Sequence, residues 1–392
     1  MRKMEEWKEY KLSELLEIPI RNGLTKPKAI RGQGVKMIGM KEIFAYDIIR
    51  NCDMELVPIT DKELASSSII EEDLLFARQS LTLEGAGKCS IVGSVNNDTV
   101  FESHLIRVRI NKKLANPYFI YYYFNSRYGK EQIKGLVQQV AAAGIRGKEL
   151  INLMIKCPSL PTQQKIANIL SSLDDKIEVN RRINEQLEEL AQALFKSWFV
   201  DFEPFKGGEF VESELGMIPE GWKVGKLGEL CQFKRGKNLL SKNAIPGGVP
   251  VVAGGLEPSC YHNVSNTKSP VVTISGSGAN AGFMRMYHQE VWASDCSYID
   301  SSCRNLLFAY CFLAINRKLL KHAQTGAVQP HVKPSDIHDF DIVIPPFEII
   351  DKFQNLVSSS ITIKGNNQIE INNLSNLRDT LLPKLMKGEI EL

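Results

Sequence analysis

A chain of 392 residues has room for two or three domains, and its hydrophobic content of 43% is enough to build ordinary cores. The formal net charge is only +3, which neither requires nor excludes nucleic acid, because binding depends on a local basic patch. The first ten residues lack an apolar signal core and no long apolar run occurs, so we expect neither secretion nor a membrane span.

The first region, residues 1–157, has the pattern of a mixed α/β domain. It opens with WKEYKLSELLEI, which predicts a short helix, and continues with a Gly- and Lys-rich loop, RNGLTKPKAIRGQG. Strands are predicted at VKMIGM, DLLFARQ, CSIVGSV and HLIRVRI. NPYFIYYYFNSRYGKEQIKGL then has helical spacing and many aromatic residues, which we expect in the core rather than on a base-stacking surface.

Residues 158–204 contain a long amphipathic helix, predicted from Pro161 to about Phe199. Apolar residues recur at alternating spacings of four and three, as in a seam along one helix face. At ~1.5 Å per residue the helix is about 55 Å long, so we expect it to act as a spacer or to pair with another helix. The predicted seam comprises Ile166, Leu170, Leu173, Ile177, Asn180, Leu187 and Leu194. A polar residue such as Asn180 costs stability there but can fix register and partner.

Residues 205–344 repeat the plan of the first region. They begin with WKVGKLGELCQF and a basic turn, KRGK, and continue with the predicted strands VPVVAG and SPVVTIS. A Gly-rich stretch, GSGANAGFM, and an aromatic helix, NLLFAYCFLAINRKLLKHA, follow. Residues 345–392 predict a second long helix over 346–386, with a proline near its end that stops or kinks it.

An internal repeat relates the two halves of the chain. A shift of 187 residues places Ile145–Leu194 over Val332–Leu381 without a gap, and a second echo at a shift of 215 aligns the two Trp-Lys openings. The seam of the second helix then comprises Phe353, Asn367, Leu374 and Leu381. The predicted order is globular region, long helix, globular region, long helix.

Candidate catalytic motifs are weak, and we expect no enzymatic activity from this chain itself. NPYF at 116–119 resembles the N-P-P-Y/F loop of amino-methyltransferases but lacks the second proline, so a helix start is favoured. GSG at 276–278 resembles a dinucleotide loop, yet the next segment predicts another strand, which favours a tight strand–turn–strand loop. The histidines are scattered and no C-x-x-C pair occurs, so we expect no metal site and reduced thiols in a cytoplasmic protein.

Nucleic-acid contact is the surface chemistry that these residues support best. Arg and Lys hold phosphates, Arg, Gln and Asn make bidentate contacts with base edges, and Gly-rich turns let backbone amides approach closely. The candidate DNA-binding residues are Arg31, Lys36, Arg78, Gln79, Lys88, Arg146 and Lys148 in the first domain, and Lys234, Arg235, Lys237, Ser275, Ser277, Asn280, Gln329 and His331 in the second. Each of them, taken singly, is more typical of a solvated surface than of a DNA contact.

The central and C-terminal blocks carry a family resemblance that extends over the whole chain. They read LPTQQKIANILSSLDDKIEVNRRINEQLEELAQALFKSWFVDFEPF and NLRDTLLPKLMKGEIEL, supported by GIRGKELINLMIKCPSLP, TGAVQPHVKPSDIHDFDIVIPP, TISGSGANAGFM and the two Trp-Lys-x-x-Lys-Leu openings. The chain resembles the specificity (S) subunit, HsdS, of type I restriction–modification enzymes. It departs from the pattern where LPTQQ replaces an acidic form, and at polar seam residues of the second helix, Ser360, Lys364 and Arg378.

The resemblance implies an α+β fold with two mixed α/β target-recognition domains in a pseudo-two-fold repeat, separated by two long antiparallel coiled-coil helices. Residues 1–157 and 205–344 would be these domains, and 158–204 and 345–392 the spacer helices. Each domain would read one half of a bipartite, asymmetric site in double-stranded DNA, and the helices would set the gap. Two methylation subunits would bring S-adenosylmethionine, and restriction subunits would bring ATP and Mg²⁺, while this chain would bind no cofactor.

Three other functions are also compatible with the sequence. A self-contained modification enzyme would need a methyltransferase or nuclease motif that is not visible in the sequence. A coiled-coil scaffold would share the long helices but would not need two basic domains of similar plan. A silent specificity cassette of the same family, without DNA targeting, would have the same sequence features.

Overall fold

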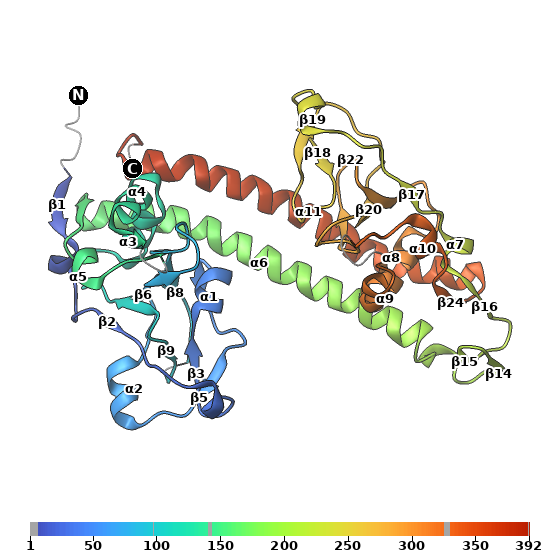
Figure 1. The fold of residues 1–392 in the computed structure, drawn as a ribbon, viewed down its shortest axis with the longest axis horizontal. Coiled ribbons are helices and arrows are strands. Elements are labelled where there is room, and N and C mark those ends of the chain that lie inside the picture. Colours follow the sequence, from blue (N-terminus) through green and yellow to red (C-terminus); the bar gives the residue numbers. More distant parts are fainter. Residues whose placement is uncertain (1–6, 97, 140–142, 325–329, 391) are drawn as a thin grey trace. The chain divides into compact units, whose positions relative to one another are not determined.

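The computed structural model describes residues 7–96, 98–139, 143–324, 330–390 and 392 (Figure 1). It divides into two compact units, unit 1 (Met1–Lys176 and Leu374–Leu392) and unit 2 (Ile177–Asn373). Each unit contains one globular region and a part of each long helix, α6 (Leu160–Phe199) and α11 (Phe347–Met386). The four-segment division at residues 157, 204 and 344 stays a prediction.

Unit 1 is built on a five-stranded sheet with the strand order β2-β10-β6-β8-β4. The strands are β2 (Arg21–Asn22), β4 (Ile48–Ile49), β6 (Leu74–Ala77), β8 (Cys89–Val92) and β10 (Leu105–Val108). β2, β10, β6 and β8 pair antiparallel, and β4 runs parallel to β8. All residues of β6, β8 and β10 are buried, as expected of short continuous apolar runs.

A smaller three-stranded sheet stands beside the first, with the order β5-β3-β9. In it β3 (Val35–Ile38) pairs antiparallel with β5 (Glu55–Val57) and parallel with β9 (Val100–Phe101). Two short helices belong to the same region, α1 (Met40–Ala45) and α2 (Asp61–Ser67). The remaining ladders join β1 (Lys8–Lys11) to β13 (Met154–Cys157), and β12 (Ala143–Gly144) to both β7 (Gln79–Ser80) and β11 (Gln138–Gln139).

The aromatic segment forms α3 (Pro117–Asn125), which is followed by α4 (Arg127–Leu136) and, later, α5 (Gly147–Leu150). The Asn116 side chain caps α3 by accepting a hydrogen bond from the Phe119 amide at 3.0 Å, and Pro117 occupies the first turn. α3 is apolar around its whole circumference and is therefore buried, in one core cluster with Ile166 and Leu170 of α6. The predictions of a helix start and of a core position are confirmed.

Unit 2 repeats this plan. Its main sheet has the order β17-β23-β20-β21, and its smaller sheet has the order β19-β18-β22. The strands are β17 (Lys234–Arg235), β18 (Val249–Val252), β19 (Cys260–His262), β20 (Val271–Ser275), β21 (Met284–Tyr287), β22 (Trp292–Ala293) and β23 (Cys296–Asp300). The other elements are β14 (Phe210–Ser213), β15 (Gly216–Pro219), β16 (Lys223–Lys226), β24 (Asp341–Ile344), α7 (Leu227–Leu230), α8 (Leu306–Ile315), α9 (Arg317–His322) and α10 (Pro334–His338).

The two units share their strand pairings and not only their strand orders. β17·β23·β20·β21 corresponds to β2·β10·β6·β8, and β16·β24 corresponds to β1·β13. In the smaller sheets, β18 pairs antiparallel with β19 and parallel with β22, as β3 does with β5 and β9. The predicted mixed α/β repeat is confirmed, and the GSG loop at 276–278 joins the antiparallel strands β20 and β21 as a strand–turn–strand connection.

One local prediction was wrong in detail. The opening segment was predicted as a helix, but Lys8–Lys11 form strand β1 because Lys8 pairs with Cys157 at the far end of the region, and only Leu12–Leu15 form a 3₁₀ turn. The second long helix, predicted over 346–386, is confirmed as α11, which includes Pro383 and ends three residues after it at Met386. Leu385, two residues after this proline, is buried in the core of unit 1, which holds the final turn in place.

The long helices run antiparallel within unit 2 and contribute to its core. Asn180 bonds Glu370 at 2.7 Å and Asn184 bonds Asn367 at 3.0 Å, so rising numbers on α6 meet falling numbers on α11. The seam residues Ile177, Asn180 and Phe353 are buried, and Leu187, Leu194 and Asn367 are half-buried. Phe195 is fully buried against aromatic rings of α8 and α11, because this part of α6 packs on the globular region as well as on its partner helix.

Two of the three polar seam residues of α11 that depart from the family pattern, Lys364 and Arg378, form ion pairs with α6. In unit 1, Arg378 contacts the largely buried Asp174 at 2.8 Å, and the Tyr122 hydroxyl of α3 donates to the same carboxylate at 2.6 Å. In unit 2, Lys364 pairs with Glu188, which also accepts from a tyrosine hydroxyl of α8. The seam residues Ile166 and Leu170 are buried in unit 1, and Leu173, Leu374 and Leu381 are half-buried.

Candidate nucleic-acid interface

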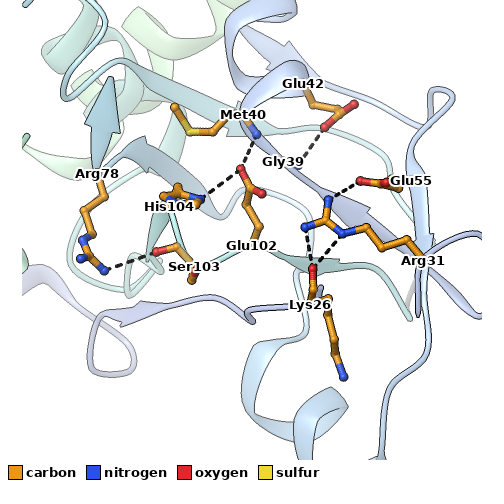
Figure 2. Close-up of polar contacts among 10 residues, drawn as sticks. All are labelled: Lys26, Arg31, Gly39, Met40, Glu42, Glu55, Arg78, Glu102, Ser103 and His104. Carbon is orange, nitrogen blue, oxygen red and sulfur yellow. Dashed lines mark hydrogen bonds and ion pairs between the residues drawn. The ribbon is translucent and has the colours of Figure 1, made fainter. Parts of the chain in front are cut away.

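Three of the basic residues predicted to contact DNA in unit 1 are occupied by partners within the unit. Figure 2 shows the Arg31 guanidinium on the Lys26 carbonyl, at 2.9 and 2.7 Å, and on the Glu55 carboxylate at 2.5 Å. The Lys36 ammonium donates to Asn51 and to a backbone carbonyl, and the Lys88 ammonium lies 3.2 Å from an aspartate. These contacts hold loops to strands, and they leave fewer donors for a ligand.

The other four predicted residues of unit 1 are brought to one edge of the fold. Gln79 pairs with Gly144 across the β7·β12 ladder, and the Ile145 amide donates to the Arg78 carbonyl at 2.9 Å. This pairing places Arg78 and Gln79 beside the segment that carries Arg146 and Lys148, although these residues are far apart in sequence. Gln79, Arg146 and Lys148 are exposed, so the edge presents two cations and an amide in addition to Arg78.

Arg78 itself is only lightly held. Figure 2 shows its guanidinium reaching the Ser103 carbonyl, with a long Nη1–O separation of 3.5 Å. The neighbouring Glu102 accepts from the Met40 amide at 2.7 Å and lies 3.9 Å from the half-exposed ring of His104. Glu102 thus binds the start of α1, while Arg78 keeps most of its hydrogen-bonding capacity.

In unit 2, Arg235 is the most firmly placed of the predicted residues. It lies on β17, and its guanidinium pairs with Asp295, which also accepts from the Ser277 hydroxyl. Gly276 provides the space for this arrangement, since a Cβ atom built there would lie 2.5 Å from Nη1 of Arg235. Nearly half of the arginine side chain stays exposed, at 45%. The side chain is therefore oriented by the protein but accessible.

The remaining predicted residues of unit 2 surround this position to different degrees. Ser277 forms an antiparallel bridge with His331, and Ser275 is buried with its hydroxyl bonded to a backbone carbonyl at 3.1 Å. Asn280 is half-buried in the turn between β20 and β21. Lys234 and Lys237 are exposed on and just after β17. Gln329 lies outside the described residues.

A cavity of about 390 Å³ opens beside Arg235. Its lining comprises Arg235, Gly276, His331, Lys333, Pro334 and Ser335. Two permanent cations and a histidine thus face one small hollow, which favours an anionic or hydrogen-bond-accepting group over an apolar one. A larger hollow of about 540 Å³ in unit 1 combines four basic residues of α4 and α11 with two acidic ones. None of the residues predicted to contact DNA lines this hollow, and the ion pairs among its residues already balance part of its charge.

Sequence reasoning missed three residues of the site in unit 2. Lys333 could have been found, because the repeat with a shift of 187 places it over Arg146, which was selected. Ser335, over Lys148, follows from the same alignment. Asp295 had no comparable signal, since a single acidic residue before a strand is ordinary and only the folded sheet brings it to Arg235.

The described residues show neither a metal centre nor a membrane span. No group of three or more His, Cys, Asp or Glu side chains within them is arranged to hold a metal ion. Among the helices that the structure describes, none is both long and apolar enough to cross a bilayer.

Comparison with known proteins decides the family. A family model described as "Type I restriction modification DNA specificity domain" matches residues 4–189 and again residues 219–373. This chain belongs to the type I restriction–modification specificity family. The two matches correspond to the two halves of the repeat, and together they cover most of the chain.

Relatives within the specificity family extend over nearly the whole length. The MjaIX specificity subunit of Methanocaldococcus jannaschii is 31% identical, over 94% of this chain and 89% of that protein. The HindI specificity subunit of Haemophilus influenzae is 24% identical, over 99% of this chain and 100% of that protein. The crystal structure of an S subunit from M. genitalium shares the fold, with a TM-score of 0.64 and 17% identity over 98% of this chain and 97% of that one.

Proposed function

We propose that this chain is the non-catalytic DNA-recognition subunit of a type I restriction–modification complex. Each unit reads one half of a bipartite site in double-stranded DNA, and because the two globular regions differ in sequence, the half-sites differ too. The observation that carries this proposal is the repeat itself. Two units of the same topology each expose a basic edge at the same place, around Arg78 in unit 1 and Arg235 in unit 2.

The residues at these edges suit the reading of DNA. Arginine, lysine, glutamine and serine side chains supply both kinds of contact that sequence recognition needs, to phosphates for position and to base edges for identity. The chain has about equal numbers of basic and acidic residues, 48 and 45, so binding depends on where the cations gather rather than on net charge.

The long helices supply the spacing between half-sites and the docking surface for partner subunits. A helix is a rigid element of about 1.5 Å per residue, so its length converts into a fixed distance along DNA. Two methylation subunits would dock on the helices and the domain edges and supply S-adenosylmethionine. Restriction subunits would supply ATP-driven, Mg²⁺-dependent steps. The adenine to be methylated would have to leave the base stack and enter a pocket of the methylation subunit.

The first test is sequencing of DNA from cells that express this chain with the methylation subunit of its own system, by a single-molecule method that detects modified bases. We expect a bipartite motif with N6-methyladenine in each half and a fixed gap. A stable complex with the methylation subunit that leaves no methylated motif would refute the recognition function and would favour a scaffold or a silent cassette.

The spacer function has its own test, designed on the helix register. Because Asn180 meets Glu370 and Asn184 meets Asn367, a shortening must remove matched segments, residues 176–182 of α6 and 368–374 of α11. Seven residues are nearly two helical turns, so the faces stay aligned while the spacer loses about 10 Å, or about three base pairs. The gap should shorten without a change in either half-site. Removing residues 176–182 alone is the control, and it should disrupt the pairing.

A further inference from the structure

The strand pairings allow a residue-by-residue comparison of the two basic edges. In unit 1 Leu105 pairs with Ala77, and in unit 2 Cys296 pairs with Ser275. Arg78 directly follows Ala77, and Gly276 directly follows Ser275, so Arg78 and Gly276 occupy equivalent positions. The following pairs, Gln79 with Gly144 and Ser277 with His331, correspond in the same way. The shift of 187 residues between Gly144 and His331 is the shift found in the sequence.

The same comparison identifies the counterpart of Arg235. On the edge strand of unit 1, Asn22 pairs with Ile106, and on the edge strand of unit 2, Arg235 pairs with Ser297. Ile106 and Ser297 are equivalent because they directly follow Leu105 and Cys296. Unit 1 therefore has Asn22 and Arg78 where unit 2 has Arg235 and Gly276. Each unit places one arginine at this point of the sheet edge, but the arginine comes from a different strand in each.

The exchange is sterically coupled in unit 2. The guanidinium of Arg235 lies against the backbone of Gly276, where any Cβ atom would approach Nη1 to 2.5 Å. An arginine at both positions could not be accommodated without displacing one of them. In unit 2 the absence of a side chain at Gly276 therefore leaves this space to the guanidinium of Arg235.

The two arginines differ in how they are held. Arg235 pairs with a carboxylate that is itself fixed by the Ser277 hydroxyl, so its planar fork has a defined direction and its charge is partly compensated. Arg78 has a single long contact to the Ser103 carbonyl and keeps its full charge. A phosphate is bound mainly through charge, whereas recognition of a base edge depends on the direction of the hydrogen-bond donors.

We propose that Arg235 is a specificity-determining residue that reads the edge of a guanine in the half-site bound by unit 2, with Asp295 as its positioning residue. The inference rests on the proposed DNA-recognition function. Guanine presents two acceptors, O6 and N7, in the major groove, and these match two donors of one guanidinium. Lys333 and His331, which line the same cavity, hold the adjoining phosphate. Arg78, the equivalent of Gly276, contacts a phosphate in the other half-site.

The test uses the complex with the methylation subunits and binding competition between the target and its single-base variants. Arg235→Ala and Asp295→Asn should each lose discrimination at one G·C position of one half-site, and Arg235→Ala should lose about 10- to 100-fold. Arg235→Lys keeps the charge but not the fork, and should relax the same position while leaving the salt dependence of binding unchanged. Arg78→Ala should weaken binding to all sequences alike, with a salt slope lower by about one.

Arg304→Ala is the matched control. This arginine forms an ion pair with Asp351 at 2.6 Å on the exposed surface of unit 2 and does not line the cavity beside Arg235, so its loss should leave discrimination unchanged. If Arg235→Ala weakens all sequences equally and lowers the salt slope, or if neither half-site contains a G·C pair, the assignment of Arg235 is overturned. If the unchanged complex shows no bipartite specificity, the proposed function itself has failed, and the two failures are thereby distinguished.

Discussion

The stability of unit 2 should fall when the pH is lowered from about 6.5 towards 4, because of one histidine. His288 follows β21, and a Cβ atom built at Gly365 of α11 would lie 2.7 Å from its Nδ1 atom, so the ring is packed against that helix. Among the described residues its Nε2 atom has no hydrogen-bond partner, although it is buried. Burial, together with the nearby Lys364 ammonium, lowers the pKa of His288 to about 4, and Glu188 opposes this only in part.

The direction of the effect follows from where the proton binds. The folded unit keeps His288 neutral down to about pH 4, whereas the unfolded chain takes up a proton near pH 6.5. The stabilising contribution is therefore complete above about pH 6.5 and declines as the pH falls to about 4. A difference of one pKa unit corresponds to about 1.4 kcal/mol, which gives an upper limit of about 3.5 kcal/mol. Because the ring is partly exposed, we expect about 2 kcal/mol.

Urea unfolding of the full chain between pH 7 and pH 4.8, combined with hydrogen exchange of α8, measures this loss in unit 2. The range above pH 4.5 keeps the contribution of Glu188 small. Burial raises the pKa of Glu188, but the Lys364 ammonium and the hydrogen bonds from Tyr310 and Gln192 together outweigh burial, and the net direction is down. His288→Gln should flatten the pH dependence, and His322→Gln, at an exposed position, should not. A His288→Gln chain with the full pH dependence of the original would refute the reasoning.

Two further substitutions test contacts within single units. Asp174→Ala should destabilise unit 1 by about 2–4 kcal/mol in thermal or urea unfolding, because it removes the acceptor of the buried Tyr122 hydroxyl and the partner of Arg378. Asp174→Asn keeps an acceptor and should therefore cost less. Gly276→Ala should change stability by about 1 kcal/mol or less, since it displaces only the end of the Arg235 side chain. It should nevertheless reduce base discrimination in competition binding. Unchanged discrimination would argue against a fixed guanidinium.

Much of the architecture was predictable because it depends on short-range patterns. The spacing of apolar residues predicted both long helices, and the Asn-Pro start of α3 predicted its first turn, since capping and proline geometry act within a few residues. The shift of 187 residues predicted the repeat, and it also relates Lys333 to Arg146 at the two basic edges. These features can be predicted from the order of residues along the chain alone.

Other features arose only from pairing between distant segments. Lys8–Lys11 form a strand because a partner strand, Met154–Cys157, lies beside them, and their own helical propensity cannot reveal this. The polar residues Lys364 and Arg378 looked like defects in the seam of α11, but in the folded units they meet carboxylates of α6. Long-range contacts override local preference wherever a buried charge or an edge strand needs a partner.

The residues of the basic edges were predictable only in part from the sequence. Residue type and loop position alone selected fifteen candidates, and Arg78, Gln79, Arg146, Lys148, Arg235, Ser277 and His331 lie together at these edges in the structure. Composition could not separate them from Arg31, Lys36 and Lys88, because a basic residue in a loop has the same local sequence whether or not a carbonyl of the protein lies within its reach. Only the tertiary structure decides this, since it determines which acceptors lie within hydrogen-bonding distance of each cation.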